Sequence, residues 1–535
     1  MSTDAALKVD PDQLPADVGV LKSLVVQLVE TLNERDRRIA KLEHHMDLLV
    51  RKVYGRTSEK LDPQQLPLFE KQVADGGEPP VIDQSAAETP STSSAKRRRG
   101  RRKKPDTLER RDVVHDLNEA EKQALAAGGQ LVLIGEEVTE QYEWEPSCLY
   151  VLRHVQKKYV CRPVLAKDGQ PAERQIITAA KPPQPIPGSS AGAGLLAYLL
   201  TSRFCDHLPY HRQERIFGRH GLRFSRQTTC DWARQLAELC GPLYRLMIDE
   251  VLASDVLHSD DTPVKVRDAH QKRQYLGRFW NYVGDEEHPL TVFAYTPDRA
   301  RDGPAEFLKR YRGYLQADAY GGYDRIFTDS RGAIVEVACW AHARRNFFEA
   351  RTSDALRAQT ALAFIGQLYK IERALGERSQ TEWRELARPE RAAKIAQHRQ
   401  EQAQPVLQQF AAWLDAEAPR LLPKEPIRQA IEYARNQWTA LNRYCDDGRL
   451  AIDNNAAERA LRGIAIGRRN WLFCGSDRGG HTAAVHFSLV ASCLRHGLDP
   501  FAYLRDVFTR LPVLLAGAHK PGDLRHLLPD RWPVQ

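Results

Sequence analysis

Apolar and polar residues alternate along three consecutive segments in the middle of the chain. Residues 256–266 are rich in β-branched side chains, and residues 275–283 and 290–295 repeat the pattern on the two sides of Gly284-Asp285. Period-two alternation interrupted by turn-forming residues is typical of β-strands. The pattern therefore predicts three strands that follow one another as a meander.

The segments after the meander alternate between helical and strand patterns. An amphipathic stretch at 302–311 carries Pro304 near its start, where a proline disturbs a helix little. Residues 314–318 and 333–338 are short apolar runs, and a helical pattern resumes at 340–350. A meander followed by helices and strands is the order of the ribonuclease-H-like α/β core. In that fold the first and fourth strands lie side by side.

Three acidic residues stand in this predicted core. Asp260 lies in the first strand and Asp318 ends the fourth, so the two carboxylates are expected to converge. Glu458 follows a long segment rich in Ala, Arg, Glu, Gln and Leu, which predicts a helical insertion. We place Glu458 on a helix capped by Asp453 or Asn454. Two strand-borne aspartates and a helix-borne glutamate suggest a nuclease-like metal site.

Longer motifs around these acids carry a resemblance to a known family. They are residues 258–264 (HSDDTPV), 315–320 (LQADAY), 339–345 (CWAHARR) and 453–462 (DNNAAERALR), with 54–60 (YGRTSEK) upstream and 467–473 (GRRNWLF) downstream. These motifs resemble those of the insertion-sequence-66 transposases of the transposase C type, and the likeness spans nearly the whole chain. The resemblance implies an acidic-triad DDE transposase.

An acidic triad suits phosphodiester chemistry. In-line displacement needs an activated nucleophile and a stabilised leaving oxygen, which two divalent ions about 3.5–4 Å apart supply. Hard ions such as Mg²⁺ or Mn²⁺ take oxygen ligands, so the resemblance implies that Asp260, Asp318 and Glu458 are catalytic and hold two ions. For an isolated acid the alternative is a solvated or capping carboxylate. Asp261, expected on the opposite strand face, and Asp453, a helix cap, are less favoured.

Cys339 and His342 stand three positions apart, where a strand is expected to meet a helix. They resemble a Cys-x-x-His element of some acidic-triad transposases. A structural zinc site needs two more ligands, and none stands nearby in the sequence, so zinc is not expected. We expect the pair to serve packing or phosphate contact, with a metal site as the alternative.

The first sixty residues carry a heptad pattern. Between residues 21 and 53 one core position reads Leu, Leu, Arg, Leu, Leu and the other reads Val, Leu, Ile, Met, Val. Nine apolar places out of ten over five heptads favour a coiled coil at residues 1–60. We expect a homo-oligomer assembled through residues 20–53. The alternative is one amphipathic helix packed on the body of the protein.

The next segment, residues 61–110, is rich in Pro, Gly, Ser and charge, which is typical of a flexible linker. Within it, residues 96–104 carry eight positive charges, equal to the formal net charge of +8 of the whole chain. Such a basic arm suits salt-sensitive binding to DNA phosphates; a solubilising charge run is the alternative. Its candidate DNA contacts are Arg97, Arg98, Arg99, Arg101 and Arg102.

Residues 111–187 predict a small antiparallel β module. Apolar and polar residues alternate at 138–145 and again at 149–155. The resembled family usually carries a cysteine-rich zinc-binding element in this region, but no Cys-x-x-Cys pair occurs here. We therefore expect any DNA contact by this module to depend on shape and charge.

Residues 188–250 predict helices, with a helix-turn-helix at 210–239. The first helix should end at Arg219, and Ser225 should cap the second. The start of such a second helix reaches base edges in the major groove. Packing of three helices without DNA is the alternative. The candidate DNA contacts are Arg223, Arg226 and Gln227.

Basic residues also follow Glu458 closely in the sequence. Arg462, Arg468 and Arg469 are expected near the proposed metal site. Guanidinium groups bind phosphate oxygens well, so we expect these three residues to hold the phosphates of the cleaved strand.

The end of the chain has its own pattern. Trp471 and Phe473 predict the start of a strand, and the glycines at 475–480 predict a turn. Residues 482–496 and 500–510 predict two closing helices.

Composition narrows the class of protein. The chain has 535 residues, enough for several domains, and is 42% hydrophobic without an apolar run long enough to cross a bilayer. No signal-peptide pattern stands at the start, and nine scattered cysteines suit a reducing compartment. We therefore expect a protein of the bacterial cytoplasm, associated with the nucleoid, with no membrane partner.

Together the patterns and the resemblance predict a multidomain α+β DNA transposase that binds insertion-sequence ends, cleaves them and transfers 3′-hydroxyl ends to target DNA. The alternatives are a nuclease or resolvase without strand transfer and a DNA-binding regulator with an inactive core. The resemblance also implies accessory proteins of the same element as partners. The expected domains are the coiled coil (1–60), linker (61–110), β module (111–187), helix-turn-helix region (188–250), ribonuclease-H-like core (251–346 and 446–498), helical insertion (347–445) and C-terminal helical tail (499–535).

Overall fold

The structure is a computed structural model that describes most of the chain from residue 108 onward. The predicted coiled coil, most of the linker and the whole basic arm lie outside the described residues. The described residues from 108 onward divide into two compact units, the smaller made of residues 346–363 and 415–432 and the larger of the remainder. The described residues are 108–126, 129–145, 148–163, 175–268, 273–300, 302–318, 322–517 and 521–533.

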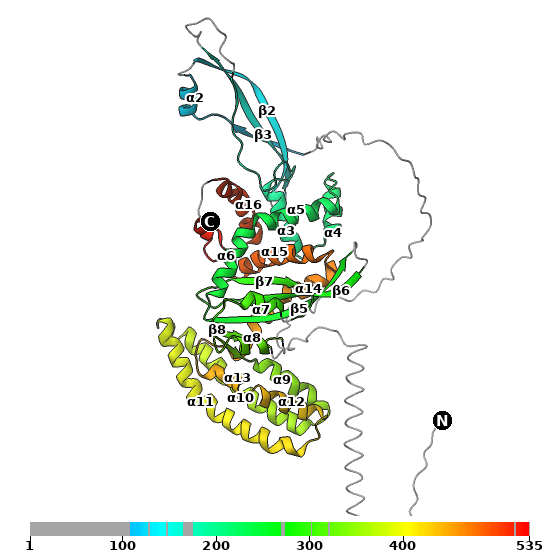
Figure 1. Cartoon of the computed structure of the whole chain (residues 1–535), viewed down its shortest axis with the longest axis vertical. Helices are drawn as coiled ribbons and strands as arrows, with labels where there is room; N and C mark the ends of the chain where they lie inside the picture. Colours follow the sequence, from blue (N-terminus) through cyan, green and yellow to red (C-terminus); the bar gives the residue numbers. More distant parts are fainter. Residues whose placement is uncertain are drawn as a thin grey trace, which may run out of the picture. The chain divides into compact units, whose positions relative to one another are not determined.

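A five-stranded mixed sheet forms part of the larger unit (Figure 1). The strands β5 (Val256–Asp268), β6 (Arg273–Val283) and β7 (Thr291–Thr296) are antiparallel neighbours. On the other side of β5, β8 (Gly313–Gln316) and β9 (Ile334–Val337) run parallel to it. The order β7-β6-β5-β8-β9 confirms the predicted meander and the adjacency of the first and fourth strands.

The remaining described segments are largely helical. Within the described residues, none of the helices combines the length and the apolar character needed to cross a membrane. The helices are α2 (Glu119–Ala126), α3 (Ala193–Phe204), α4 (Tyr210–Arg219), α5 (Arg226–Leu239), α6 (Gly241–Leu252), α7 (Asp302–Leu308), α8 (Asp324–Asp329), α9 (Trp340–Glu349), α10 (Ala355–Gln380), α11 (Arg388–Glu417), α12 (Pro426–Asn436), α13 (Trp438–Asn442), α14 (Asn455–Trp471), α15 (Asp477–Arg495) and α16 (Pro500–Ala516).

Two C-terminal helices pack on the five-stranded sheet. α14 lies against β5, and α15 lies against β7. The hydroxyl groups of Ser488 and Ser492 on α15 accept hydrogen bonds from the backbone N–H groups of Phe293 and Thr291, at 2.8 and 2.9 Å. These bonds satisfy backbone donors of β7, the edge strand, where no further strand is available to do so.

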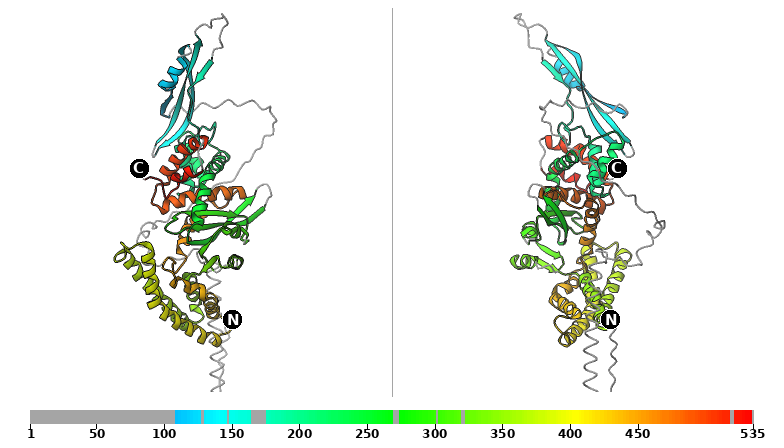
Figure 2. Two further views of the ribbon diagram at one scale, coloured as in Figure 1. Left: turned by 60° about the vertical axis from the view of Figure 1, so that its left-hand side comes forward. Right: turned by 90° about the vertical axis from the view of Figure 1, so that its right-hand side faces the viewer.

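A second sheet precedes the helices. β2 (Gly129–Glu145) and β3 (Cys148–Pro163) form the long antiparallel hairpin that alternation predicted (Figure 2). β1 (Arg110–His115) pairs with β3 in parallel and β4 (Gln175–Thr178) pairs with it in antiparallel. The parallel strand β1 was not predicted from the sequence.

A buried carboxylate joins the hairpin to α3. Glu143 on β2 accepts a hydrogen bond from the backbone N–H of Leu195 at 2.9 Å. A Cβ atom at Gly194 would lie 2.2 Å from the carboxylate of Glu143, so a residue with a side chain does not fit there. Glycine thus allows the start of α3 to approach the strand closely.

The predicted helix-turn-helix is present in α4 and α5. As expected, Ser225 caps α5, because its hydroxyl accepts a hydrogen bond from the backbone N–H of Thr228 at 3.1 Å. The ring of Phe224 in the turn packs edge-to-face on Phe217 and Trp232, with centroid separations of 5.6 and 5.0 Å. These aromatic contacts hold the two helices at the turn.

The predicted insertion between α9 and α14 is helical, as its composition indicated. In the larger unit, the rings of Phe364 and Phe410 stack with centroids 5.0 Å apart, and Phe410 also packs on Trp340 and Trp438. The indole N–H of Trp340 donates to the carbonyl of Leu441 at 2.9 Å. Aromatic packing therefore fixes the start of α9, which follows β9 directly.

Two predictions near the C-terminus are wrong. Trp471 is the last residue of α14 and does not begin a strand, and the predicted turn at 475–480 overlaps the first turn of α15. Helix α15 begins early because Ser476 caps it and because a Cβ at Gly480 would lie 2.5 Å from the ring of Tyr295. The glycine thus permits close packing of a helix on the sheet and does not mark a turn.

Candidate active site

Asp260 stands on the central strand of the five-stranded sheet. Its backbone N–H donates to the side-chain oxygen of Asn281 on β6 at 2.9 Å, and the amide nitrogen of Asn281 donates to the carbonyl of Ala457 at 2.7 Å. The buried Asn281 therefore connects the strand that carries Asp260 to the helix that carries Glu458. Sequence reasoning missed this residue, although a carboxamide inside an apolar strand was a visible signal.

A second buried carboxamide holds the start of α14. The Nδ2 group of Asn454 donates to the carbonyl of Ser259 at 2.8 Å, and its Oδ1 atom lies 3.1 Å from Nδ1 of His258. Because its side chain makes these long-range bonds, Asn454 does not cap the helix with it. Asp453 accepts from the backbone N–H of Asn455 at 3.1 Å. Of the two predicted caps, Asp453 thus supplies the side-chain bond.

The three acids act on one another electrostatically. Burial and the negative charge of Asp318, with smaller effects from Asp261 and Glu458, raise the pKa of Asp260 to about 8. Carboxylates held together in this way either retain a proton or bind a cation near neutral pH. Asp260 on β5 therefore experiences the charge of Asp318, which lies two residues after the end of β8, and of Glu458 on α14.

Asp261, the neighbour of Asp260, sits in a different electrostatic setting. Its carboxylate accepts from Arg278 at 2.7 Å and from Arg299 at 2.8 Å, and its side chain is only 2% exposed. Arg299 also lies 3.8 Å from the carboxylate of Asp318. Two guanidinium groups therefore neutralise Asp261, while Asp260 sits among acids.

Cys339, just before α9, and His342, in its first turn, lie near Glu458. Nε2 of His342 lies 3.7 Å from Oε1 of Glu458, and one ligand atom from each of Cys339, His342 and Glu458 lies within 4.8 Å of the others. Burial raises the pKa of the Cys339 thiol to about 12, which favours the neutral thiol over a metal-binding thiolate. In the sequence, Cys339 and His342 had no further ligand nearby. In the structure, Glu458 lies close to both of them.

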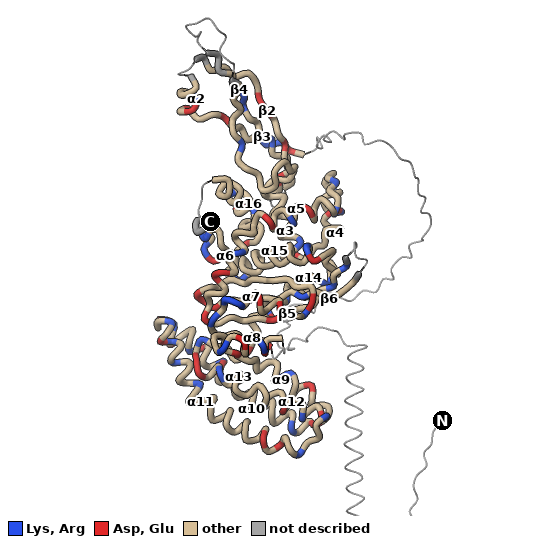
Figure 3. The backbone as a smooth tube through the Cα atoms, viewed as in Figure 1, with Lys and Arg blue, Asp and Glu red and all other residues tan. Residues whose placement is uncertain are grey.

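Figure 3 marks the acidic and basic residues along the backbone, including those of α14. Several arginines follow Glu458 on this helix. Arg462 and Arg469 are exposed and lie four and eleven positions after Glu458, close to whole turns of the helix. Arg468 instead turns toward β5, where its guanidinium donates to the hydroxyl of Thr262 at 2.7 Å. The structure therefore leaves Arg462 and Arg469 facing solvent and uses Arg468 to fasten the helix to the sheet.

The predicted DNA contacts of the helix-turn-helix lie together at the start of α5. Arg223, Arg226 and Gln227 are all exposed. The guanidinium of Arg226 lies 3.4 Å from Glu214, and Gln227 donates to Asp231 at 3.1 Å. These partners are themselves on the surface, so the contacts are easily exchanged for DNA groups. The arginines of the basic arm lie outside the described residues.

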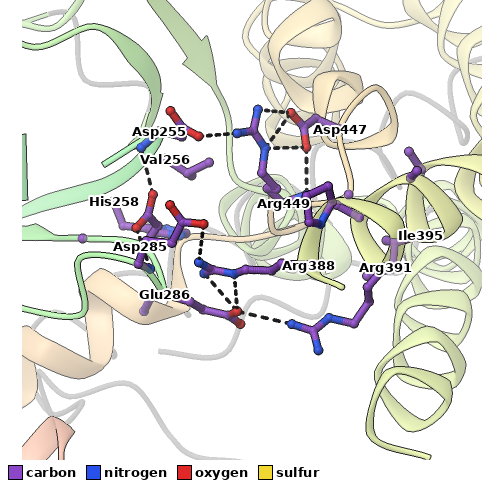
Figure 4. A pocket seen from close by; sticks show the side chains of 18 of the residues that line it. Asp255, Val256, His258, Asp285, Glu286, Arg388, Arg391, Ile395, Asp447 and Arg449 are labelled. Carbon is purple, nitrogen blue, oxygen red and sulfur yellow. Dashed lines mark hydrogen bonds and ion pairs between the residues drawn. The ribbon is translucent and has the colours of Figure 1, made fainter. Parts of the chain in front are cut away.

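A charged cavity of about 630 Å³ lies near the start of β5, lined also by α11 and the segment before α14 (Figure 4). Arg388 pairs there with Glu286 and Glu287 at 3.0 and 2.9 Å, and Arg449 pairs with Asp447 at 2.7 Å. The three clustered acids are not among the lining residues. Because its arginines already face acids, the cavity joins structural elements and offers little free charge to a ligand.

Comparison with known families accounts for most of the chain. The Transposase IS66 family matches residues 188–482, the IS66 C-terminal element matches residues 488–529, and the Transposase C of IS166 homeodomain matches residues 41–113.

Two proteins of Sinorhizobium fredii are similar throughout. The protein named uncharacterized protein y4hP is 32% identical over 523 residues, covering 92% of this chain and 89% of its own. Uncharacterized protein y4jD is 29% identical over 528 residues, covering 95% and 97%. In agreement with the motif resemblance, this chain belongs to the IS66 transposase family.

Proposed function

We propose that this chain is a DNA transposase that cleaves the ends of its element and joins the freed 3′-hydroxyl groups to target DNA. The observation that carries the proposal is the electrostatic cluster of Asp260, Asp318 and Glu458 on the five-stranded sheet and α14. The strand order and the position of the acids support a ribonuclease-H-like core. Membership in a transposase family supports DNA as the substrate.

The donor set of the cluster fits hard divalent cations. Three carboxylates offer the oxygen ligands that Mg²⁺ and Mn²⁺ prefer. A cation also offsets the repulsion that raises the pKa of Asp260. Asp260, Asp318 and Glu458 would therefore hold the ions. When bound, two such ions supply an activated nucleophile and a stabilised leaving oxygen.

Residues around the cluster position the acids and the substrate. Asn281 and Asn454 hold β5 against α14, which sets the distance between Asp260 and Glu458. His342 lies beside Glu458 and orients its carboxylate. Arg462 and Arg469 bind the phosphates of the strand on the Glu458 side of α14. Positioning of this kind is a large part of catalysis in phosphoryl transfer.

Recognition of the element's ends is assigned to the helix-turn-helix. The turn before its second helix, α5, carries Arg223, and the first turn of α5 carries Arg226 and Gln227. This end of the helix enters the major groove in proteins with this motif. The basic arm at 96–104 adds a sequence-independent attraction to phosphates. Pairing of two chains through residues 20–53 would bring two active sites to two ends, and accessory proteins of the element would join that complex.

The test is cleavage and joining of a labelled DNA that carries the element's end, with Mg²⁺ or Mn²⁺ present. We expect Glu458→Gln to lose activity on the order of a thousandfold and to keep DNA binding. Glu306→Gln changes a carboxylate that is 77% exposed on α7 and serves as the matched control. Equal cleavage by wild type and Glu458→Gln would contradict the assignment. Binding without cleavage by wild type would favour a regulator.

A further inference from the structure

Two apolar side chains stand in solvent just beyond the last turn of α14. Leu472 is 61% exposed and Phe473 is 40% exposed. Leu472 has a φ of 68° and a ψ of −42°, a positive-φ conformation that leucine rarely adopts. The chain thus accepts backbone strain at the residue that turns these two side chains outward. We call Leu472 and Phe473 the apolar tip.

The apolar tip is anchored on both sides. Trp471 before it is buried, with 7% exposure. After it, the backbone N–H of Cys474 donates to the carbonyl of Lys265 at 2.8 Å, and the carbonyl of Cys474 accepts from the N–H of Arg267 at 2.9 Å. The tip is therefore held against the end of β5, and its exposure does not result from a loose loop.

Exposed basic residues lie on the two elements that flank the apolar tip, β5 and α14. The guanidinium of Arg267 lies 6.0 Å from the ring centroid of Phe473. Lys265 and Arg267 on β5 are exposed, as are Arg462 and Arg469 on α14. None of these four forms an ion pair with an acid that the structure describes, in contrast to the arginines of the charged cavity. An apolar surface beside cations that pair with no described acid complements a polyanion with apolar faces, which describes a nucleic acid strand.

We propose that the apolar tip binds an unpaired base of the DNA strand whose phosphates lie along Arg462 and Arg469. The inference rests on the proposed function, because it takes DNA as the substrate. Aromatic rings stack on bases of any sequence, a nearby arginine strengthens the contact, and apolar side chains such as Phe and Leu open base steps. Along α14, Glu458 and Arg469 are separated by about 16 Å of helix rise. At the rise of about 3.4 Å per phosphate of a duplex strand, the phosphate at Arg469 lies roughly five nucleotides from the reacting phosphate. The base bound by the apolar tip lies beyond that phosphate.

The test compares two DNAs of the same sequence, one fully paired and one ending in a short single strand. A 2-aminopurine in the single strand reports stacking through its fluorescence. We expect wild type to prefer the DNA with the single-stranded end by about tenfold and to quench the probe. Phe473→Ala should lose both effects, while Phe473→Trp should keep them. Leu494→Ala, at a leucine that is 54% exposed on α15, is the matched control.

The outcomes separate this inference from the proposed function. If wild type binds both DNAs equally, or if Phe473→Ala behaves as wild type, the inference is overturned while the proposed function stands. Loss of self-association by Phe473→Ala in sedimentation, with probe quenching unchanged, would assign the tip to a protein interface and also overturn it. If wild type binds neither DNA, both fail. Thermal unfolding of each variant confirms that it is folded.

Discussion

The cluster of acids and the charged cavity are both built on β5 and the chain around the start of α14, yet they use charge in opposite ways. In the cavity, Arg388 and Arg449 face acids at distances between 2.7 and 3.0 Å. In the cluster, the negative charges of Asp318 and Glu458 help raise the pKa of Asp260 to about 8. In the cavity, ion pairs between arginines and acids join parts of the chain. In the cluster, carboxylates that repel one another form a site that a cation can bind.

The first prediction, with the largest expected effect, concerns how the stability of the protein depends on pH. Folding raises the pKa of Asp260 from 3.8 to about 8, so without metal the folded state binds more protons than the unfolded state between these values. The contribution of Asp260 to stability should therefore fall as pH rises from about 4 to about 8. At pH 8, Asp260→Asn should raise the Tm of the metal-free protein by about 5 °C or more. Thermal unfolding at several pH values measures this.

Asp447 in the cavity provides a control of opposite sign. Burial pushes its pKa upward, but hydrogen bonds from Arg449 outweigh this and lower the pKa. A lowered pKa contributes stability that is present above the unfolded value of 3.8 and is lost as pH falls through the folded value. Asp447→Asn should therefore lower the Tm at neutral pH. If Asp447→Asn raised the Tm as Asp260→Asn does, the cavity and the acid cluster would not differ in how they use charge.

The second prediction concerns His342. If it orients Glu458, His342→Ala should reduce cleavage by about 10- to 100-fold and raise the Mg²⁺ concentration needed for half-maximal activity. DNA affinity should stay unchanged, because His342 lies on the acid side of the site. Titrations of cleavage with Mg²⁺ and binding curves measured in parallel separate the two effects.

Metal analysis distinguishes this positioning role from a metal site of its own. Stoichiometric zinc in purified wild type that disappears in Cys339→Ser would show that Cys339, His342 and Glu458 bind one ion together. In that case the loss of activity in His342→Ala would reflect the loss of that ion and not the orientation of Glu458.

The third and smallest effect concerns the arginines of the two regions. Arg462→Ala and Arg469→Ala should each weaken DNA binding and reduce the slope of log affinity against log salt by about 0.9. Arg388→Ala in the cavity should leave the slope unchanged and cost about 1 kcal/mol of stability or less, because its ion pairs are partly exposed. Binding titrations at several salt concentrations measure both. If Arg462→Ala, Arg469→Ala and Arg388→Ala changed the salt slope equally, the arginines of α14 and of the cavity would not differ in DNA binding.

Local patterning predicted the strands of the core well. The first strand begins at Val256, where apolar alternation placed it, and the order of the five strands follows from a meander and two further apolar runs. The short helix α8 was missed, since six residues carry too little periodicity to detect. The predictions at 471–480 failed because Gly480 reads as a turn residue unless the ring of Tyr295 beneath it is known.

The residues of the candidate site also divide into those that the sequence predicted and those that it did not. The acids Asp260, Asp318 and Glu458 were selected from motifs and strand order. The carboxamides of Asn281 and Asn454 were not recognised as the residues that hold β5 and α14 together. Their partners are far away in the chain, and no local rule of periodicity or capping connects residues at such separations.

The sequence by itself therefore determined the five strands of the core, most of the longer helices, the family and the three candidate acids, because periodicity, capping and motif spacing are local properties. Tertiary structure decided which charges are neutralised and which are not. It paired Asp261 with arginines and left Asp260 among acids, although the two are adjacent. The physical reason is that strand geometry sends neighbouring side chains to opposite faces, and only the elements packed on each face set the charge that each side chain meets.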